Sequence, residues 1–518
     1  MAKKKQENTL QYLQMPLPEG RKASKMTKVN FGGLNKRYTI DSGELSMVNN
    51  MSTNEYPYLT PSKRRVEVST YYEHPISMFG FDTFLIVIYR KNSSVPNYYD
   101  VKIDYITKTG KSYTSTLQKD TQDKDDVPRS VVQFNVFEED ENGTIVNGYF
   151  RRRLLIFPDK KSMFFELDDL TNDTNNEGDD EFTIYDMDDA ENAIITPPIK
   201  YATVHLSRVF GVDDDRVYAS GFNDYTNWAL DNADYDEGYN ENNAWMSQTQ
   251  SNTKADGKFT GITNFQGHIV CFKRDYMHEI YNTKNPFRIV DVYAEGAIDN
   301  RSIQDVDGKL IFVSDDDVKI YTGSNPRVIG YNLNMSQYTY AVSGTDNRNY
   351  YLYCEDGENK HLYVYDTLAE VWMEQSIDSK VINFAHNNNG MYMLCADGHI
   401  YKMDTEDYNH EWSFETDLIT SRTVDIKHIK KLQMLVELEE GAKVRVYVLY
   451  DDEKFDAMES EKKAQRLVYT SEKCGRFPIR LKPRKTANYG FKLHIEGEGY
   501  AKLYELEIFV ESGGDLYV

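Results

Sequence analysis

The sequence has little of what exported, membrane-spanning or metal-binding proteins carry. It contains four cysteines in 518 residues, and their spacing fits neither a metal site nor a disulfide framework. Cys271, Cys354 and Cys395 lie inside apolar runs, which is typical of a protein made in a reducing cytoplasm. It has no run of about 18 apolar residues and no apolar segment after its basic start. We therefore expect neither a transmembrane helix nor a secretory signal.

Catalytic signatures are also missing. The ten histidines are scattered, and there is no HExxH, GxSxG, phosphate-binding loop or dinucleotide-binding glycine run. Aspartates cluster at 213–215 and 315–317, and glycosidases do use paired carboxylates. However, the sialidase-type Ser-x-Asp-x-Gly-x-Thr-Trp turn is absent, and aspartate is common in turns because it bonds to its own backbone. We expect no catalytic residue, no metal ligand, no cofactor and no enzymatic activity.

Long helical periodicity is nearly absent, and the one helix we expect covers residues 458–467. Elsewhere one hairpin recurs: an apolar run, a tight acidic or glycine turn, and a second run ending in an aromatic residue. Its copies are 84–89 with 98–106, 154–157 with 163–165, 208–212 with 217–218, 268–272 with 277–281, 310–313 with 318–321, 350–354 with 362–365, and 391–395 with 399–403.

The spacing of these hairpins predicts a β-propeller. The closing tyrosines Tyr281, Tyr321, Tyr365 and Tyr401 are 40, 44 and 36 residues apart, close to the length of a four-stranded blade. One blade cannot bury both of its faces, so neighbouring blades must stack around an axis. We predict six or seven blades over residues 61–408, after an extended N-terminal arm and lead-in over residues 1–60. The alternative is a series of β-meanders in sandwiches.

From about Trp412 the pattern changes to strict alternation. Val444, Val446 and Val448 share one face, as do Phe491, Leu493 and Ile495, and the residues between them are mostly polar. Lys492, His494 and Glu496 are expected on a solvated face, because alternation of period two indicates a sheet with one packed side. The prediction is an all-β chain that ends in an antiparallel β-sandwich over residues 409–518, with the boundary in the polar stretch 404–411.

The net charge of −23 argues against a general or sequence-specific duplex-DNA binder. Residues 1–28 nevertheless have a net charge of +5, which leaves −28 on the rest of the chain. This basic segment is either a solvated terminus or a contact for an acidic neighbouring surface. Its basic residues are Lys3, Lys4, Lys5, Arg21, Lys22, Lys25 and Lys28.

Two polar stretches are further candidates for partner contact. Residues 166–191 hold twelve acids and no Lys or Arg, so we expect a solvated loop, or a contact for a basic partner surface or for the chain's own basic segment. Residues 221–257 contain Trp228 and Trp245. Aromatic side chains in so long a loop could stack on sugars, contact an adjoining subunit or fold back onto the propeller. We expect subunit contact.

Residues 30–65 read NFGGLNKRYTIDSGELSMVNNMSTNEYPYLTPSKRR. The Phe-Gly-Gly-Leu-Asn opening, the Ile-Asp-Ser-Gly-Glu-Leu line and the later Tyr-Pro and Leu-Thr-Pro resemble the N-terminal region of propeller-like virion proteins of tailed bacteriophages. Residues 222–228, 271–281, 477–484 and 493–499 resemble the same group, so loose patterns cover most of the chain. The acidic insertion and the C-terminal domain depart from it.

The resemblance implies a virion structural protein of the tail or neck, similar to the tail hub, or stabilisation, protein of short-tailed phages. Such a subunit would form homo-oligomeric rings, contact portal, adaptor or other tail components, be made in the host cytoplasm, and neither insert into membranes nor catalyse a reaction. The alternatives are a carbohydrate-binding or glycan-degrading tail protein that acts in host recognition, and a cytoplasmic propeller scaffold of the host.

Overall fold

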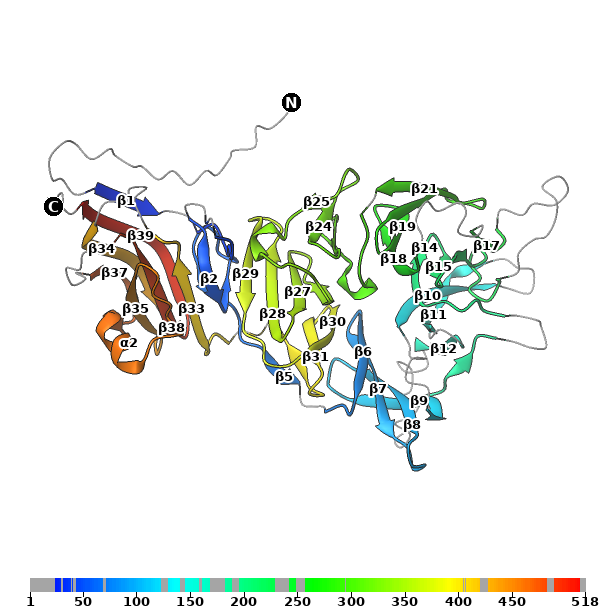
Figure 1. Cartoon of the computed structure of the whole chain (residues 1–518). Coiled ribbons are helices and arrows are strands. Elements are labelled where there is room, and N and C mark those ends of the chain that lie inside the picture. Colours follow the sequence, from blue (N-terminus) through cyan, green and yellow to red (C-terminus); the bar gives the residue numbers. More distant parts are fainter. Residues whose placement is uncertain are drawn as a thin grey trace.

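The computed structural model describes residues 24–28, 31–38, 40, 43–68, 71–122, 129–139, 145–157, 161–167, 182–188, 195–228, 242–247, 257–293, 295–403, 405, 407–419, 427–481 and 489–512. This part of the chain consists almost wholly of antiparallel strands (Figure 1). A ring of small sheets forms one unit, and two larger sheets lie beside it. No helix in these ranges is long and apolar enough to cross a membrane.

Seven four-stranded sheets of the described chain form the ring, and we number them as blades 1 to 7. Blade 1 contains β6 (Pro75–Phe81), β7 (Phe84–Asn92), β8 (Tyr99–Ile106) and β9 (Ser112–Thr121); blade 2 contains β10 (Ser130–Glu139), β11 (Ile145–Phe157), β12 (Met163–Glu166) and β13 (Tyr185–Asp186); blade 3 contains β14 (Tyr201–His205), β15 (Arg208–Val212), β16 (Val217–Ala219) and β17 (Trp245–Met246). Blade 4 contains β18 (Phe259–Phe265), β19 (His268–Lys273), β20 (Met277–Tyr281) and β21 (Arg288–Tyr293); blade 5 contains β22 (Gln304–Val306), β23 (Lys309–Val313), β24 (Val318–Tyr321) and β25 (Arg327–Val328). Blade 6 contains β26 (Tyr340–Thr345), β27 (Asn349–Asp356), β28 (Asn359–Asp366) and β29 (Val371–Gln375); blade 7 contains β30 (Val381–Asn387), β31 (Gly390–Cys395), β32 (Ile400–Lys402) and β5 (Val66–Val68).

The recurring hairpins are the second and third strands of the blades, so that prediction is confirmed for all seven copies. These strands are apolar on both faces because each blade packs between two others. In β23, for example, the four residues from Leu310 to Val313 are all buried. Aspartate also forms the hydrogen bonds within turns that the sequence predicts. The Asp213 carboxylate accepts hydrogen bonds from the backbone N–H groups of Asp215 and Arg216, both at 2.6 Å.

The ring of blades is closed. Each pair of neighbouring blades shares a cluster of buried apolar residues, and one such cluster joins Met78 and Val87 of blade 1 to Leu394 and Ile400 of blade 7. Blade 7 takes its fourth strand, β5, from the N-terminal part of the chain, with Val68 opposite Ile400. The predicted all-β propeller is confirmed, with seven blades.

The second unit contains two antiparallel sheets. One has the order β1 (Ser24–Lys28), β39 (Ala501–Ser512), β34 (Lys427–Leu438) and β37 (Gly475–Leu481); the other has the order β2 (Leu45–Asn49), β33 (Glu411–Thr416), β38 (Phe491–Glu498), β35 (Lys443–Tyr450) and β36 (Leu467–Ser471). Residues from both sheets, such as Val436 and Val446, belong to one buried cluster. We call this unit the C-terminal sheets, although the segment predicted as an arm supplies one edge strand to each sheet.

The predicted alternation is present in the C-terminal sheets except where the connection between β35 and β36 covers them, since Tyr447 and Leu449 pack against Phe455 and Met458 of that connection. Val444, Val446 and Val448 are at most 1% exposed, as the pattern requires. His494, expected on a solvated face, is instead 2% exposed because Phe455 stacks on its ring at 3.6 Å. Phe455 belongs to the connection between β35 and β36, which also contains the predicted helix, α2 (Ser460–Arg466). The solvated-face prediction for His494 was therefore wrong, since an insertion covers this part of the sheet.

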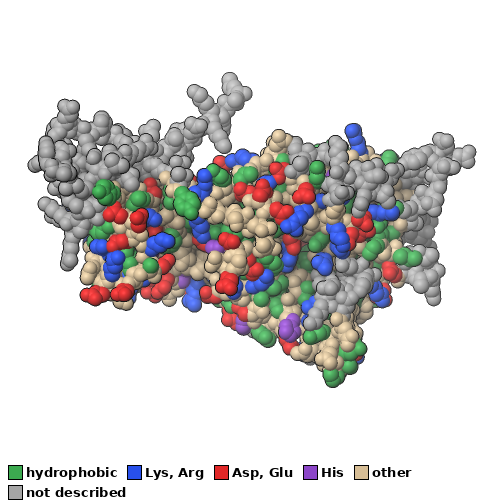
Figure 2. All heavy atoms as spheres, viewed as in Figure 1, with side chains coloured by type: hydrophobic (Ala, Val, Ile, Leu, Met, Phe, Trp, Pro, Cys, Tyr) green, Lys and Arg blue, Asp and Glu red, His purple; other side chains and the backbone are tan. Residues whose placement is uncertain are grey.

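Charged residues of both signs are interspersed over the face of the molecule shown in Figure 2. Ion pairs account for part of this mixing, for example Arg274 with Asp315 and Arg445 with Glu496. The excess of acidic residues is therefore not gathered into one patch on this face.

Candidate functional site at the junction of the two units

The propeller and the C-terminal sheets are joined by residues 31–38 and 43–68, which we call the junction segment. It runs from the C-terminal sheets past β29, the outer strand of blade 6, and ends as β5 in blade 7 (Figure 1). On the way it forms a two-stranded ribbon of β3 (Met51–Ser52) and β4 (Thr60–Pro61). One of the stretches on which the phage resemblance is based, residues 30–65, therefore connects the two units.

The Phe-Gly-Gly-Leu-Asn motif packs between the two units. Phe31 meets Phe414 of β33 edge to face, with ring centroids 6.0 Å apart. The backbone N–H of Leu34 donates to the carbonyl of Trp372 in β29 at 2.8 Å. Gly33 has a φ of +80°, and a Cβ added there would lie 2.6 Å from the Cβ of Val371. Only glycine suits both this backbone conformation and this close approach.

Lys36 ties the motif to blade 6 through a mostly buried carboxylate. Its Nζ donates to the Tyr363 hydroxyl at 2.9 Å and to Oε1 of Glu374 at 3.0 Å. His361 Nδ1 lies 2.8 Å from the same carboxylate. Burial alone would raise the pKa of Glu374, but the hydrogen bonds from His361 and Lys36 outweigh it and lower the pKa. Glu374 therefore stays ionised and holds the motif against the blade.

Asn50 connects three elements with one side chain and its backbone. Its backbone N–H donates to the carbonyl of Glu374 at 3.0 Å, and its Oδ1 accepts from the N–H of Ser376 at 2.9 Å. Its Nδ2 donates to the carbonyl of Glu411, at the start of β33, at 2.8 Å. The junction segment is thereby fixed to blade 6 and to the C-terminal sheets at the same point.

Further along, buried and half-buried polar contacts extend this attachment on both sides. Thr53 Oγ1 donates to Oδ2 of Asp366 at 2.7 Å, and Arg348 Nη2 donates to the same oxygen at 2.6 Å. Burial raises the pKa of Asp366, yet these bonds lower it overall. On the other side Glu55 accepts hydrogen bonds from the side chains of Tyr500 and Lys502, at the start of β39.

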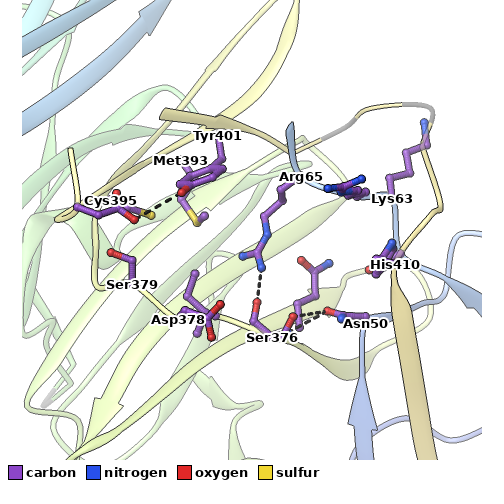
Figure 3. Close-up of a pocket in the computed structure, with 15 residues that line it drawn as sticks. Asn50, Lys63, Arg65, Ser376, Asp378, Ser379, Met393, Cys395, Tyr401 and His410 are labelled. Atoms are coloured by element: carbon purple, nitrogen blue, oxygen red, sulfur yellow. Dashed lines mark hydrogen bonds between the residues drawn. The ribbon is translucent and has the colours of Figure 1, made fainter. Parts of the chain in front are cut away.

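A cavity of about 250 Å³ lies where the junction segment enters blade 7 (Figure 3). Its walls come from the junction segment, the connection between β29 and β30, the β31–β32 hairpin and the stretch before β33. We call it the junction cavity. It is lined by Asn50, Ser62, Lys63, Arg64, Arg65, Gln375, Ser376, Ile377, Asp378, Ser379, Met393, Cys395, Asp397, Tyr401 and His410.

Two nitrogens at this cavity are buried and have no hydrogen-bond partner among the described residues. Arg65 donates through Nη2 to the carbonyl of Ser376, but its Nη1 is unpartnered. His410 Nε2 lies 3.4 Å from the Ser62 hydroxyl, and its Nδ1 is unpartnered. Burial lowers the pKa of both side chains. Buried nitrogens without a hydrogen-bond partner are uncommon in folded proteins, so these two indicate a place where a polar group could bind.

The residues predicted for partner contact do not come together at the junction cavity. Lys3, Lys4, Lys5, Arg21 and Lys22 lie outside the described residues. Lys25 and Lys28 belong to β1, opposite Phe509 and Leu506 of β39. Most of the acidic stretch 166–191 also lies outside the described residues.

Trp228 and Trp245 lie apart from the junction, in blade cores. Trp228 is 8% exposed and packs within the cluster between blades 2 and 3. Trp245 in β17 is half-buried, and its ring meets Phe287 edge to face at 5.4 Å. Of the three alternatives for this loop, folding back onto the propeller describes Trp228. Apolar burial of a large ring outweighs its display to solvent.

Sequence reasoning missed Lys36, Asn50, Arg65 and His410. Their partners lie hundreds of residues away in the chain, for example 311 residues between Arg65 and Ser376. A local pattern cannot reveal such pairings. The one available signal was the Ser-Lys-Arg-Arg run at 62–65, directly before a strand. No group of three or more His, Cys, Asp or Glu side chains in the described part of the chain is arranged to hold a metal ion.

No protein-family model matches the sequence, and no curated protein matches it. Among solved structures, the chain is similar to BamB from Moraxella catarrhalis, with 9% identity, 68% of this chain and 99% of that chain covered, and a TM-score of 0.34. It is also similar to the β-propeller domain of the Trilobed protease from Pyrococcus furiosus, with 9% identity, 64% and 96% covered, and a TM-score of 0.36. A Bacteroides thetaiotaomicron protein of unknown function is 12% identical over 74% and 94%, with a TM-score of 0.29. The propeller assignment itself follows from the sheet order and the closed ring of buried clusters.

Proposed function

We propose that the protein is a structural component of a tailed-bacteriophage virion, a ring-forming tail or neck hub subunit that docks neighbouring tail or connector proteins. The observation that carries this proposal is the position of the resembling sequence. Residues 31–37 are the clasp between the propeller and the C-terminal sheets, with Phe31 and Leu34 each 1% exposed. Part of the likeness to phage virion proteins thus lies in residues that fix how the two units are joined, and a structural subunit needs such a fixed shape.

The rim of blade 5 offers a surface suited to docking. Tyr38 is fully exposed, and Tyr331 beside the clasp is 57% exposed. The Arg37 guanidinium lies 3.4 Å from the centroid of the Tyr331 ring. Tyrosine and arginine are enriched in protein–protein interfaces and among the few residues there that dominate the binding energy. A neighbouring subunit or tail protein that covers these three side chains would dock directly on the rigid joint.

The burial of Trp228 weakens the alternative function, which is glycan binding through Trp228 and Trp245. Sugar-binding aromatic rings must be open to the ligand, whereas Trp228 is part of the core between two blades. No specific observation therefore favours the carbohydrate-binding candidate over the structural one.

Assembly is the decisive test. We expect the purified protein to form closed rings in sedimentation-velocity runs and electron micrographs, and to bind a neighbouring virion protein encoded close to it. The Tyr38→Ala/Tyr331→Ala double variant should assemble more weakly. Tyr489→Ala is the matched control, because Tyr489 is 61% exposed but lies in the C-terminal sheets. A protein that stays monomeric at high concentration and binds no virion component would refute the proposal.

A further inference from the structure

The junction cavity carries opposite charges on opposite walls. Figure 3 shows Asp378 and Ser379 on one side, Lys63 and His410 on the other, and Arg65 between them. Asp397, two residues beyond Cys395, adds a second carboxylate to the lining. A ligand with a single charge would be attracted by one wall and repelled by the other.

The basic wall has hydrogen-bond donors to offer. Arg65 uses Nη2 on the Ser376 carbonyl, which leaves the buried Nη1 without an acceptor. His410 Nδ1 is buried and unpartnered as well. Burial lowers the pKa of Arg65, and the attraction of nearby groups, Asp378 among them, does not outweigh this cost of burying its charge. A carboxylate placed between Arg65 and His410 would satisfy both nitrogens.

The acidic wall has an acceptor to offer. No side chain in the described residues donates to the Asp378 carboxylate, and only its backbone carbonyl is engaged, by Lys360 Nζ at 2.7 Å. Asp397 is different, because it accepts from the N–H of His399 at 3.0 Å and from the Tyr401 hydroxyl at 3.5 Å. Asp378 is therefore the carboxylate that is open to an incoming ammonium group.

We propose that the junction cavity binds a small zwitterion of the α-amino-acid type, with its carboxylate at Arg65 and His410 and its ammonium group at Asp378. The volume of about 250 Å³ is below the range of about 300–1,000 Å³ that drug-sized ligands occupy, so the ligand must be small. This inference is independent of the virion role, since it depends only on the side chains of the cavity.

Binding there would act on the closure of the ring. Arg65 directly precedes β5, Asp378 lies between β29 and β30, and His410 directly precedes β33. A ligand held by all three would connect blade 7, blade 6 and the C-terminal sheets. Because such a ligand binds the folded chain and not the unfolded one, it raises the free energy of unfolding.

Calorimetric titration and thermal unfolding with glycine test the inference. We expect glycine to bind and to raise the unfolding temperature, whereas acetate and methylammonium, which each carry one half of the zwitterion, should bind at least tenfold more weakly. Asp378→Asn and Arg65→Gln should each weaken glycine binding at least tenfold. Arg274→Gln is the matched control, because Arg274 lies outside the cavity lining and donates to the Asp315 carboxylate at 2.7 Å, and it should leave binding unchanged.

Asp378 is exposed, so Asp378→Asn keeps the fold and tests the site even where Arg65→Gln destabilises the closing strand. Three results would overturn the inference: no heat and no shift with glycine, equal binding of acetate and glycine, or unchanged glycine binding by Asp378→Asn. The last two results would mean that the cavity binds simple anions or water and not a zwitterion.

Discussion

The propeller and the C-terminal sheets are both antiparallel, but they bury their apolar residues differently. Six of the seven blade interfaces have a buried cluster of their own. The interface of blades 5 and 6 is merged with the core of the C-terminal sheets into one cluster that also contains Leu34. Most of the propeller is therefore stabilised by local contacts between neighbours. At the joint, in contrast, the two units share one core and should unfold together.

Truncating the shared core should have the largest effect. Leu34→Ala removes a side chain that is 1% exposed in the merged cluster, and large-to-small changes of this kind cost about 2–5 kcal/mol of unfolding free energy. We expect hydrogen exchange to speed up in blades 5 and 6 and in the C-terminal sheets alike. Chemical denaturation gives the total cost.

Leu310→Ala is the control for that experiment. Leu310 is equally buried, but it belongs to the cluster between blades 4 and 5. Faster exchange should then be confined to the propeller near those blades. If both variants loosened the C-terminal sheets equally, the contrast between local and shared cores would be incorrect.

The clasp glycine should give the next largest effect. Gly33→Ala forces a Cβ to within 2.6 Å of Val371 and places it on a backbone that is left-handed, with a φ of +80°. Strain and overpacking together should cost about 2–4 kcal/mol. Gly308 also has a positive φ, of +71°, but an added Cβ there meets nothing within 4 Å. Gly308→Ala should therefore cost only about 1 kcal/mol, and equal melting temperatures for the two variants would show that the clasp is not tightly packed.

The smallest effect should come from replacing His494, whose imidazole is buried under Phe455. Burial alone would lower the pKa of His494, but Glu415 and Glu496 outweigh it and raise the pKa above 6.5. His494 in turn is the main cause that lowers the pKa of Glu496 to about 2. The stabilisation from the charged imidazole is complete below pH 6.5 and disappears as the pH rises through the folded pKa.

His494→Gln should accordingly remove part of the pH dependence of stability. Melting curves between about pH 6 and pH 9 measure this as the difference between the wild-type protein and the variant. The contributions of His205 and His410 cancel in this difference, because both proteins contain them. Burial lowers the pKa of these two histidines, so their contribution to stability has the opposite pH dependence. A constant difference across this range would mean that folding does not raise the pKa of His494.

Patterns within a few residues predicted the hairpins, the helix at 458–467 and the packed faces of the C-terminal sheets, because alternation and turn residues act locally. They could not predict that β2 pairs with β33, since Leu45 and Thr416 are far apart in the chain. The burial of His494 also depends on Phe455 of a distant segment, and that of Trp228 on the packing of two blades. The junction cavity escaped prediction for the same reason, because each of its walls comes from a different part of the sequence.

The closing strand of blade 7 has a consequence for biosynthesis. β5 is translated early, but its partner β32 follows only after almost the whole propeller, and the bond between the Thr405 hydroxyl and the Arg64 carbonyl spans 341 residues. On the ribosome the ring must therefore stay open, with the edge of β5 unpaired, until the seventh blade emerges. Contacts between such distant residues slow folding, and an unpaired strand edge is prone to aggregate. Slow translation or a chaperone that shields β5 during this interval would raise the yield of closed rings.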